Sequence, residues 1–167
     1  MIPNPVTHRS NGTTAIHIVY KAVPFDCIID TTDYPKVAGY RWNVKPDTKS
    51  PTKTVWRVYT GQKHTGIHQF ISGFRRDHKD HDGLNNRQEN LRPCTQRQNC
   101  YHRRKRTGDY TSKFKGVSFD KRRDKWVTKI GNRYVGGFAT EIEAAQRYNN
   151  AALIEHGDFA VLNEIGG

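Results

Sequence analysis

The segment from Asp77 to Asn99, DHKDHDGLNNRQENLRPCTQRQN, constrains the fold of this chain more than any other stretch. Residues 74–78 and 91–94 are predicted to be short strands, and the Asp, Gly and Asn residues between them are typical of a loop. Thr95, followed three residues later by Gln98, has the spacing of a capping box and predicts the start of a helix. The segment is therefore predicted to fold as strand, loop, strand and helix.

The side chains of this segment provide three kinds of chemistry. Its carboxylate and amide oxygens are ligands that a hard cation such as Mg²⁺ prefers, and its imidazole rings can accept a proton from water. Its arginines can hold a phosphate group through paired hydrogen bonds. Metal-assisted attack on a phosphodiester needs this combination, so we expect the segment to be the catalytic core of a nuclease.

The formal net charge of +12 predicts a polyanionic partner. After residue 113, seven of the eight lysines and arginines lie between Lys115 and Arg133, so one face of this last part should be strongly basic. No apolar run is as long as a membrane span, and the first residues lack the apolar core of a signal peptide. A cytoplasmic protein without a membrane partner is therefore expected.

The cysteines, Cys27, Cys94 and Cys100, are odd in number and form no C-x-x-C pair, so a disulfide framework is not expected. A zinc site built from Cys94, Cys100, His81 and His102 is conceivable. The spacing of the two cysteines differs from that of zinc knuckles, which disfavours this alternative.

The first part of the chain is predicted to form a small sheet. Residues 1–14 are rich in Pro, Asn, Thr and Gly and are expected to be an extended or loosely held leader. Pro24 is expected to separate the first two strands, and a helical turn at 67–71 should end at Gly73. Short β-branched and aromatic runs predict strands at 15–20, 25–29, 40–44 and 54–59.

The last part is predicted to be a three-stranded antiparallel meander followed by one helix. Thr140 and Glu143 form a second capping box, ahead of a helix at 141–156. The strands are predicted at 114–119, 125–130 and 133–138. The helical stripe expected to face the sheet is Ile142, Ala145, Tyr148, Ala152 and Leu153.

Alternation along the middle strand of this meander divides its side chains between two faces. Trp126, Thr128 and Ile130 should face the helix. Lys125 and Lys129 should face outward, and a basic open sheet face suits insertion into a groove of duplex DNA.

Together these elements predict an α+β fold in two domains. An N-terminal sheet and nuclease domain would cover residues 1–104, with its motif at 67–104 ending in the predicted helix. A basic linker would follow at 105–113 and a DNA-binding domain at 114–167. The linker is cationic enough to lie along a phosphate backbone, or it serves only as a solvated tether.

The stretch IHQFISGFRRDHKDHDGLNNRQENLRPCTQRQN resembles the HNH nuclease motif in its H-N-N form, common in phage and intron homing endonucleases. The resemblance rests on the Asp-His pair, the Asp-Gly-x-x-Asn-Asn loop, the following Asn-Leu and the Thr-x-x-x-Asn at the helix start. The upstream stretch VPFDCIIDTTDYPKVAGYRW is similar to the leader of many phage HNH proteins. The resemblance implies a ββα-metal module acting in the cytoplasm of a phage-infected bacterial cell.

In that pattern Asp77 and Asn99 match the metal ligands, implying one Mg²⁺ or Mn²⁺ ion per active site. His78 matches the general base, and Asn90 matches the middle Asn, which is expected to pin the loop by amide–backbone hydrogen bonds. Because the last position is Asn rather than His, a hard cation is favoured over zinc. One active site could nick DNA, whereas double-strand cleavage would need a dimer or a second binding event, and the oligomeric state stays open.

Further basic and imidazole groups surround the motif. His68 is expected to pack beside the site, and His81 to be a solvated loop residue, with a second base or a phosphate contact as the alternative. The residues expected to position the DNA backbone are Arg75, Arg76, Arg87, Arg92, Arg103 and Arg104.

Residues 112–163 are similar to the plant ethylene-response-factor DNA-binding domain, through KGVSFDKRRDKWVTKI and GGFATEIEAAQRYNNAALIEHGDFAVLN. The recurring points are Lys-Gly-Val, Lys-Trp, Gly-x-Phe, Glu-x-Ala-Ala and the final Leu-Asn. The family's DNA-contacting positions fall on Lys115, Ser118, Arg122, Lys125, Lys129 and Tyr134. Ser118 stands where the family has an Arg, and Lys129 where it has a Glu, so the plant target sequence should not be transferred.

The leading hypothesis is a metal-dependent endonuclease that cuts double-stranded DNA. The alternative is a sequence-specific DNA-binding regulator with an inactive nuclease module. The complete set of Asp77, His78, Asn90 and Asn99 favours the nuclease, because loss of one of them would be the expected mark of decay. An RNA-binding protein is disfavoured because the sheet lacks paired exposed aromatics for stacking bases.

Overall fold

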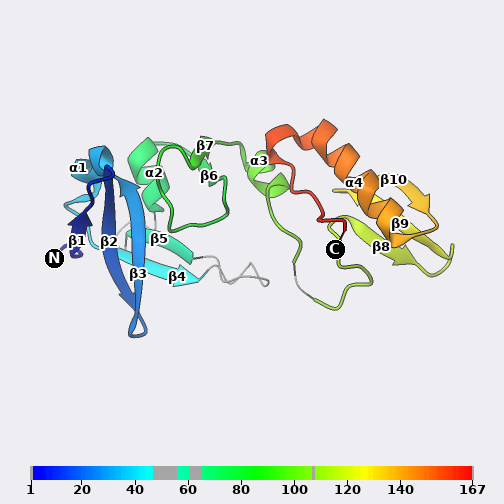
Figure 1. Ribbon diagram of the computed structural model, residues 1–167, viewed down its shortest axis with the longest axis horizontal. Coiled ribbons are helices and arrows are strands. Elements are labelled where there is room, and N and C mark those ends of the chain that lie inside the picture. The colour runs from blue at the N-terminus through cyan, green and yellow to red at the C-terminus, as the bar shows by residue number, and fades with distance from the viewer. Residues whose placement is uncertain (1, 47–55, 61–64, 107, 167) are drawn as a thin grey trace. The chain divides into compact units, whose positions relative to one another are not determined.

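The computed structural model describes residues 2–46, 56–60, 65–106 and 108–166. Its helices and small antiparallel sheets confirm the α+β class (Figure 1). The chain divides into two compact units, residues 1–95 and residues 96–167, each of which is described by itself. Among the described residues, no helix has the length and apolar character needed to cross a membrane.

The first unit begins with an antiparallel sheet in the order β1–β2–β3. Strand β1 (Val6–His8) pairs with β2 (Thr13–Tyr20), which pairs along its whole length with β3 (Val23–Asp30). The prediction of a loose leader at 1–14 is wrong where β1 pairs with β2. Pro24 lies within β3 instead of ending a strand, because an edge strand tolerates a residue without an N–H group.

A second strand pair follows in this unit. The 3-10 turn η1 (Thr31–Asp33) and helix α1 (Tyr34–Val37) lead to β4 (Trp42–Pro46), which pairs with β5 (Trp56–Thr60). The predicted strand at 54–59 starts outside the described residues. The buried core of the unit combines side chains from both strand systems and the short helices: Ile16, Ile18, Cys27, Ile29, Val37, Trp42, Val44, Val58, Ile67 and Ile71.

The predicted strand, loop and strand complete the first unit. Helix α2 (Ile67–Ser72) ends at Gly73, whose φ of 75° is the left-handed conformation of a helix C-cap, as predicted. Strand β6 (Arg76–His78) then pairs antiparallel with β7 (Leu91–Pro93). Both strands are shorter than predicted, and the loop of residues 79–90 connects them (Figure 1).

The second unit contains helix α3 (Gln96–Tyr101) and the predicted meander. Strands β8 (Val117–Asp120), β9 (Lys125–Ile130) and β10 (Arg133–Phe138) form an antiparallel sheet in the order β10–β9–β8. Helix α3 ends before the predicted end at Arg104. Because the observed unit starts at α3, its boundary differs from the predicted boundaries at 104 and 114.

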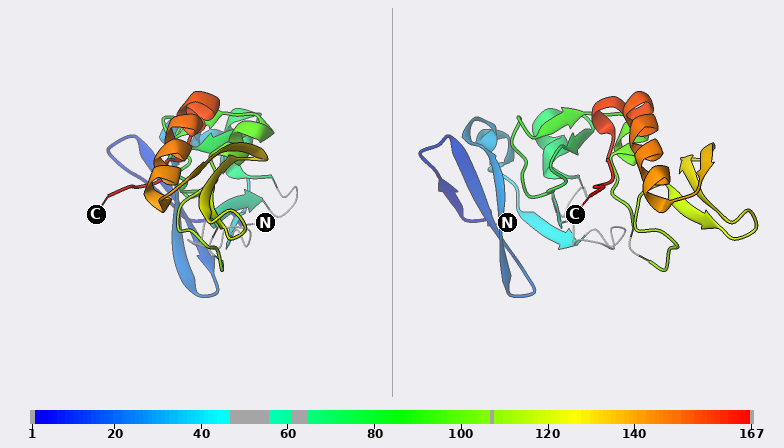
Figure 2. Two further views of the ribbon diagram at one scale, coloured as in Figure 1. Left: turned by 90° about the vertical axis from the view of Figure 1, so that its right-hand side faces the viewer. Right: turned by 45° about the vertical axis from the view of Figure 1, so that its right-hand side comes forward.

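One helix covers a face of this sheet (Figure 2). Helix α4 (Glu141–His156) begins with the predicted capping box, in which Thr140 and Glu143 bond to each other's backbone N–H groups, and the 3-10 turn η2 (Gly157–Phe159) follows it. Thr128 is fully buried and its Oγ1 atom donates to the Ala144 carbonyl at 2.7 Å. The helix therefore lies close to the sheet.

The apolar stripe of α4 differs in part from the prediction. Ala144, Ala145, Tyr148 and Ala152 are buried, but Ile142 and Leu153 are 54% and 52% exposed. Small alanines allow close approach to the sheet, so the contact strip is narrow and the larger residues at its edges stay in solvent. Gly116, with φ 73°, fits under this strip, because a Cβ atom there would lie 2.2 Å from the Tyr148 ring.

Candidate functional site

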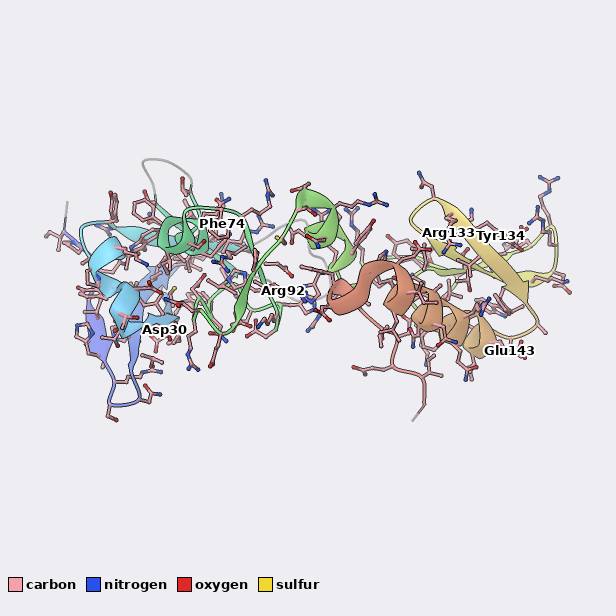
Figure 3. All side chains as sticks on the ribbon, turned by 90° about the horizontal axis from the view of Figure 1, so that it is seen from above. Asp30, Phe74, Arg92, Arg133, Tyr134 and Glu143 are labelled. Carbon is pink, nitrogen blue, oxygen red and sulfur yellow. The ribbon has the colours of Figure 1, made fainter. Side chains whose placement is uncertain are left out.

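Asp77 and His78 are consecutive residues of β6, so their side chains point to opposite faces of the hairpin. Asp77 is buried, and its Oδ2 atom accepts from Arg92 Nε at 3.0 Å and Nη2 at 2.9 Å. Arg92 is the directly paired residue on β7 (Figure 3). The sequence predicts that Arg92 positions DNA, whereas the structure gives it an ion pair with Asp77.

His78 is half-buried, and its Nε2 atom lies 3.0 Å from Asn86 Oδ1. Burial lowers the pKa of His78 below its ordinary value, although the hydrogen bond to Asn86 and the nearby carboxylates of Asp80, Asp77 and Asp82 act in the opposite direction. The ring is therefore neutral at neutral pH, which is the form that can accept a proton.

His68, from α2, packs edge-on against His78, with 5.1 Å between the ring centroids. Burial, with a smaller contribution from His78, lowers the pKa of His68 to about 3. The His68 ring therefore stays neutral beside His78, in agreement with the expectation that it packs near the site.

Amide and carboxylate groups fix the loop between β6 and β7. Asn90 Oδ1 accepts from the Asp80 backbone N–H at 3.2 Å, and Asn90 Nδ2 donates to the Asn85 carbonyl at 2.8 Å. These are the amide–backbone hydrogen bonds expected of Asn90. Asp80 also accepts from the Asp82 backbone and from the side chains of Asn85 and Asn90. His81 lies inside this network at a φ of 64°.

Strands β3 and β5 of the same unit contact the loop between β6 and β7. The backbone of Ile28 in β3 donates to the Leu84 carbonyl at 2.8 Å and accepts from the Asn86 N–H at 2.7 Å. At Gly83 a Cβ atom would lie 2.0 Å from the Trp56 carbonyl oxygen of β5. Only glycine fits there, so β3 and β5 together determine the path of residues 83–86.

The two expected metal ligands belong to different units. Asp77 is on β6 of the first unit, and Asn99 is on α3 of the second. Within the described ranges, no group of three His, Cys, Asp or Glu side chains could hold a metal ion. The donor chemistry of one carboxylate and one amide oxygen fits Mg²⁺ or Mn²⁺ and does not fit zinc.

The arginines of the first unit differ in their surroundings. Arg87 forms ion pairs with Glu89 at 2.7 Å and Asp30 at 3.7 Å. The guanidinium of Arg76 lies over the exposed Phe74 ring, 4.4 Å from its centroid. Arg75 is exposed. The predicted contact with the DNA backbone therefore suits Arg75 better than Arg87, whose charge is balanced by two acids.

In the second unit, four of the predicted DNA-binding residues share the sheet face opposite α4. Register pairs Ser118 with Val127 and Lys129 with Tyr134, and Lys125 lies on the same face of β9. Ser118, Lys125, Lys129 and Tyr134 are all exposed, with Tyr134 next to Arg133 at the start of β10 (Figure 3). Arg122 lies in the turn between β8 and β9. We call these five predicted residues the basic sheet face.

Lys115 does not extend the basic sheet face. Its Nζ atom donates to the carbonyls of Tyr101 at 2.7 Å and Arg103 at 2.6 Å, at the C-terminal end of α3. Burial lowers the pKa of Lys115 to about 8. Arg103 and Arg104 themselves are exposed just after the helix. Lys115 therefore stabilises a helix end, where a cation is favourable, instead of facing solvent with the other lysines.

The sequence analysis did not assign the roles of Gly83 and Asn86 near His78. Each role depends on a contact with a distant strand, β5 for Gly83 and β3 for Asn86. The ion pair of Arg92 with Asp77 across the hairpin was not predicted either. The adjacent amides of Asn85 and Asn86 could have indicated a contact with His78, because a buried side-chain amide almost always forms hydrogen bonds.

Comparisons with models of protein families, with curated proteins and with solved structures found no match for this chain.

Proposed function

We propose that this protein is a metal-dependent endonuclease that hydrolyses phosphodiester bonds in double-stranded DNA, in the manner of phage HNH homing endonucleases. The observation that carries the proposal is the pair on β6, a buried carboxylate followed by a neutral imidazole on a loop held in place by hydrogen bonds. The net charge of +12 supports a polyanionic substrate.

In this proposal His78 accepts the proton of the attacking water, a task that requires its neutral form. Asp77 would be a ligand of the Mg²⁺ or Mn²⁺ ion, which when bound would stabilise negative charge on the phosphate and on the leaving 3′ oxygen. Arg92 keeps the Asp77 carboxylate in one orientation through its paired hydrogen bonds. Asn90 holds the loop that follows His78.

The second unit would bind the DNA on which the first unit acts. The basic sheet face has the strand surface and the exposed cations that suit a DNA groove. A DNA-binding module linked to a nuclease raises the effective concentration of the nuclease on its substrate. Ser118 and Lys129 replace residues of the plant pattern, so the target sequence would differ from that of the plant domain.

Cleavage of supercoiled plasmid and phage DNA, with Mg²⁺, Mn²⁺ or EDTA, tests the proposal. We expect metal-dependent cutting that falls by about a hundredfold or more in His78→Ala, the usual contribution of a general base. His17→Ala, a change in β2 at a half-buried residue that bonds to Thr7 and Asp26, is the control. Nicked or linear product would report whether one strand or both are cut.

The regulator with an inactive nuclease module is the second candidate, and the ion pair between Arg92 and Asp77 favours it, because a paired carboxylate is a weaker metal ligand. The same assay separates the two. Tight DNA binding without cutting of any DNA supplied would select the regulator.

A further inference from the structure

We propose that Asn86 is a positioning residue that fixes the tautomer of His78, so that Nε2 carries the hydrogen and Nδ1 is the atom that accepts a proton. The inference rests on the proposed function for its catalytic meaning, but the tautomer itself is a property of the folded protein. It identifies which ring atom must face the attacking water, which the HNH resemblance leaves open.

The orientation of the Asn86 amide follows from its other contacts. The side chain is 0% exposed, and its Nδ2 atom lies 3.0 Å from the Gly83 carbonyl oxygen. A carbonyl only accepts hydrogen bonds, so the amide atom facing it must be the NH₂ group. The Nδ2 atom also lies 3.3 Å from Cys27 Sγ. The remaining amide atom, Oδ1, therefore faces His78.

This orientation determines the state of the imidazole. Asn86 Oδ1 can only accept, and His78 Nε2 is 3.0 Å from it, so Nε2 must donate. A neutral imidazole has one N–H group and one lone pair, so the lone pair is at Nδ1. In the part of the chain that the structure describes, Nδ1 of His78 forms no hydrogen bond. It is thus left as the acceptor for a ligand or a water molecule.

Asn86 can act in this way because it is itself held rigidly. Its backbone N–H donates to the Ile28 carbonyl of β3 at 2.7 Å, and its partner Gly83 is packed against the Trp56 carbonyl of β5. The Cys27 thiol, whose pKa burial raises to about 12, stays protonated and uncharged beneath the amide. An amide flip would face the Gly83 carbonyl with Oδ1 and lose that hydrogen bond.

Long-range ¹H–¹⁵N NMR of the imidazole rings, in mildly alkaline buffer without metal, tests the proposal directly. The His78 signals are assigned by their absence from His78→Ala. In the wild-type protein we expect a protonated, pyrrole-type shift at Nε2 and a pyridine-type shift at Nδ1. In Asn86→Ala the two shifts should move towards a tautomeric average.

Asn85→Ala is the matched control, because the Asn85 side chain donates to Asp80 and not to His78. It should leave the His78 shifts unchanged. In the cleavage assay, Asn86→Ala should lower kcat by about ten- to a hundredfold, as loss of an outer hydrogen-bond partner does, with DNA affinity unchanged.

A pyridine-type shift at Nε2 in the wild-type protein would overturn the proposal, whether or not Asn86→Ala folds. Unchanged ring shifts in a folded Asn86→Ala would overturn it as well. A protein that shows the expected tautomer but cuts no DNA would contradict the proposed nuclease function. The role of Asn86 in fixing the tautomer of His78 would still hold.

Discussion

The loop between β6 and β7 and the basic sheet face are both rich in polar side chains, yet they use them in opposite ways. In the loop, Asn86 is fully buried and Asn90 is 7% exposed, and their amides bond to groups of the same unit. On the basic sheet face, Lys125 and Lys129 extend into solvent. A proton acceptor needs one fixed orientation, whereas binding to phosphates depends mainly on charge. Substitutions should therefore reduce stability in the loop and DNA affinity on the sheet.

Gly83→Ala should have the largest effect on stability. Its Cβ atom would lie 2.0 Å from the Trp56 carbonyl oxygen, a main-chain atom that no side-chain rotation can move. We expect the free energy of unfolding of the full chain, measured with urea, to fall by about 3 kcal/mol, the upper end for overpacking. Gly39→Ala is the control, because a Cβ atom there meets nothing within 4 Å. Equal unfolding midpoints for the two variants would refute the tight fit.

Asn90→Ala should destabilise the first unit by about 2 kcal/mol, because it removes the hydrogen bonds of a buried amide to the Asp80 backbone and carboxylate and to the Asn85 carbonyl. The Asp80 backbone N–H should then exchange faster with deuterium. Asn150→Ala, on the exposed side of α4, should change neither quantity. Unaltered exchange at Asp80 in Asn90→Ala would mean that this amide does not hold the loop.

Thr140→Ala should destabilise the second unit by about 1 kcal/mol, the usual contribution of a helix N-cap. Glu143→Gln, which can keep the reciprocal hydrogen bond of the capping box, should cost less (Figure 3). Thermal melts followed by circular dichroism would measure both. If Glu143→Gln cost as much as Thr140→Ala, the charge of Glu143 would contribute as much to stability as the Thr140 cap.

The double variant Lys125→Gln, Lys129→Gln should have the smallest effect on stability, within about 0.5 kcal/mol, as is usual for surface positions. Its DNA affinity should depend less steeply on salt, with the slope of log K against log salt reduced by about 2. Lys115→Gln should show the reverse, a lower melting temperature with an unchanged slope, because Lys115 bonds to α3. An unchanged slope in the double variant would exclude the basic sheet face from DNA binding.

Sequence patterns predicted those structural features that depend on residues close together in the chain. The capping box at Thr140, the stop at Gly73 and the alternation along β9 all depend on residues a few positions apart, and each is present. The hydrogen bonds of Asn90 could be expected because they stay within its own loop.

Contacts between distant strands were not predictable in this way. The pairing of β1, the position of Asn86 over Cys27 and the clash that restricts Gly83 each join residues far apart in sequence. Lys115 was assigned to the DNA surface because it falls on a DNA-contacting position of the plant domain, but its ammonium group donates to two carbonyls at the end of α3. The exposure of Ile142 was not predictable for the same reason, because the number of α4 residues that are buried depends on the sheet that packs against the helix.

The hydrogen bonds from Lys115 to the end of α3 also determine where this protein can be divided. A fragment cut at the linker, starting near residue 114, would keep the sheet and α4 but lose the two carbonyls that Lys115 binds, along with the Tyr101 ring that stacks on His156 at 3.8 Å. That fragment would contain a half-buried ammonium without partners. A DNA-binding fragment intended for fusion to another enzyme should therefore start at Gln96, so that the lysine and the helix end that it serves are transferred together.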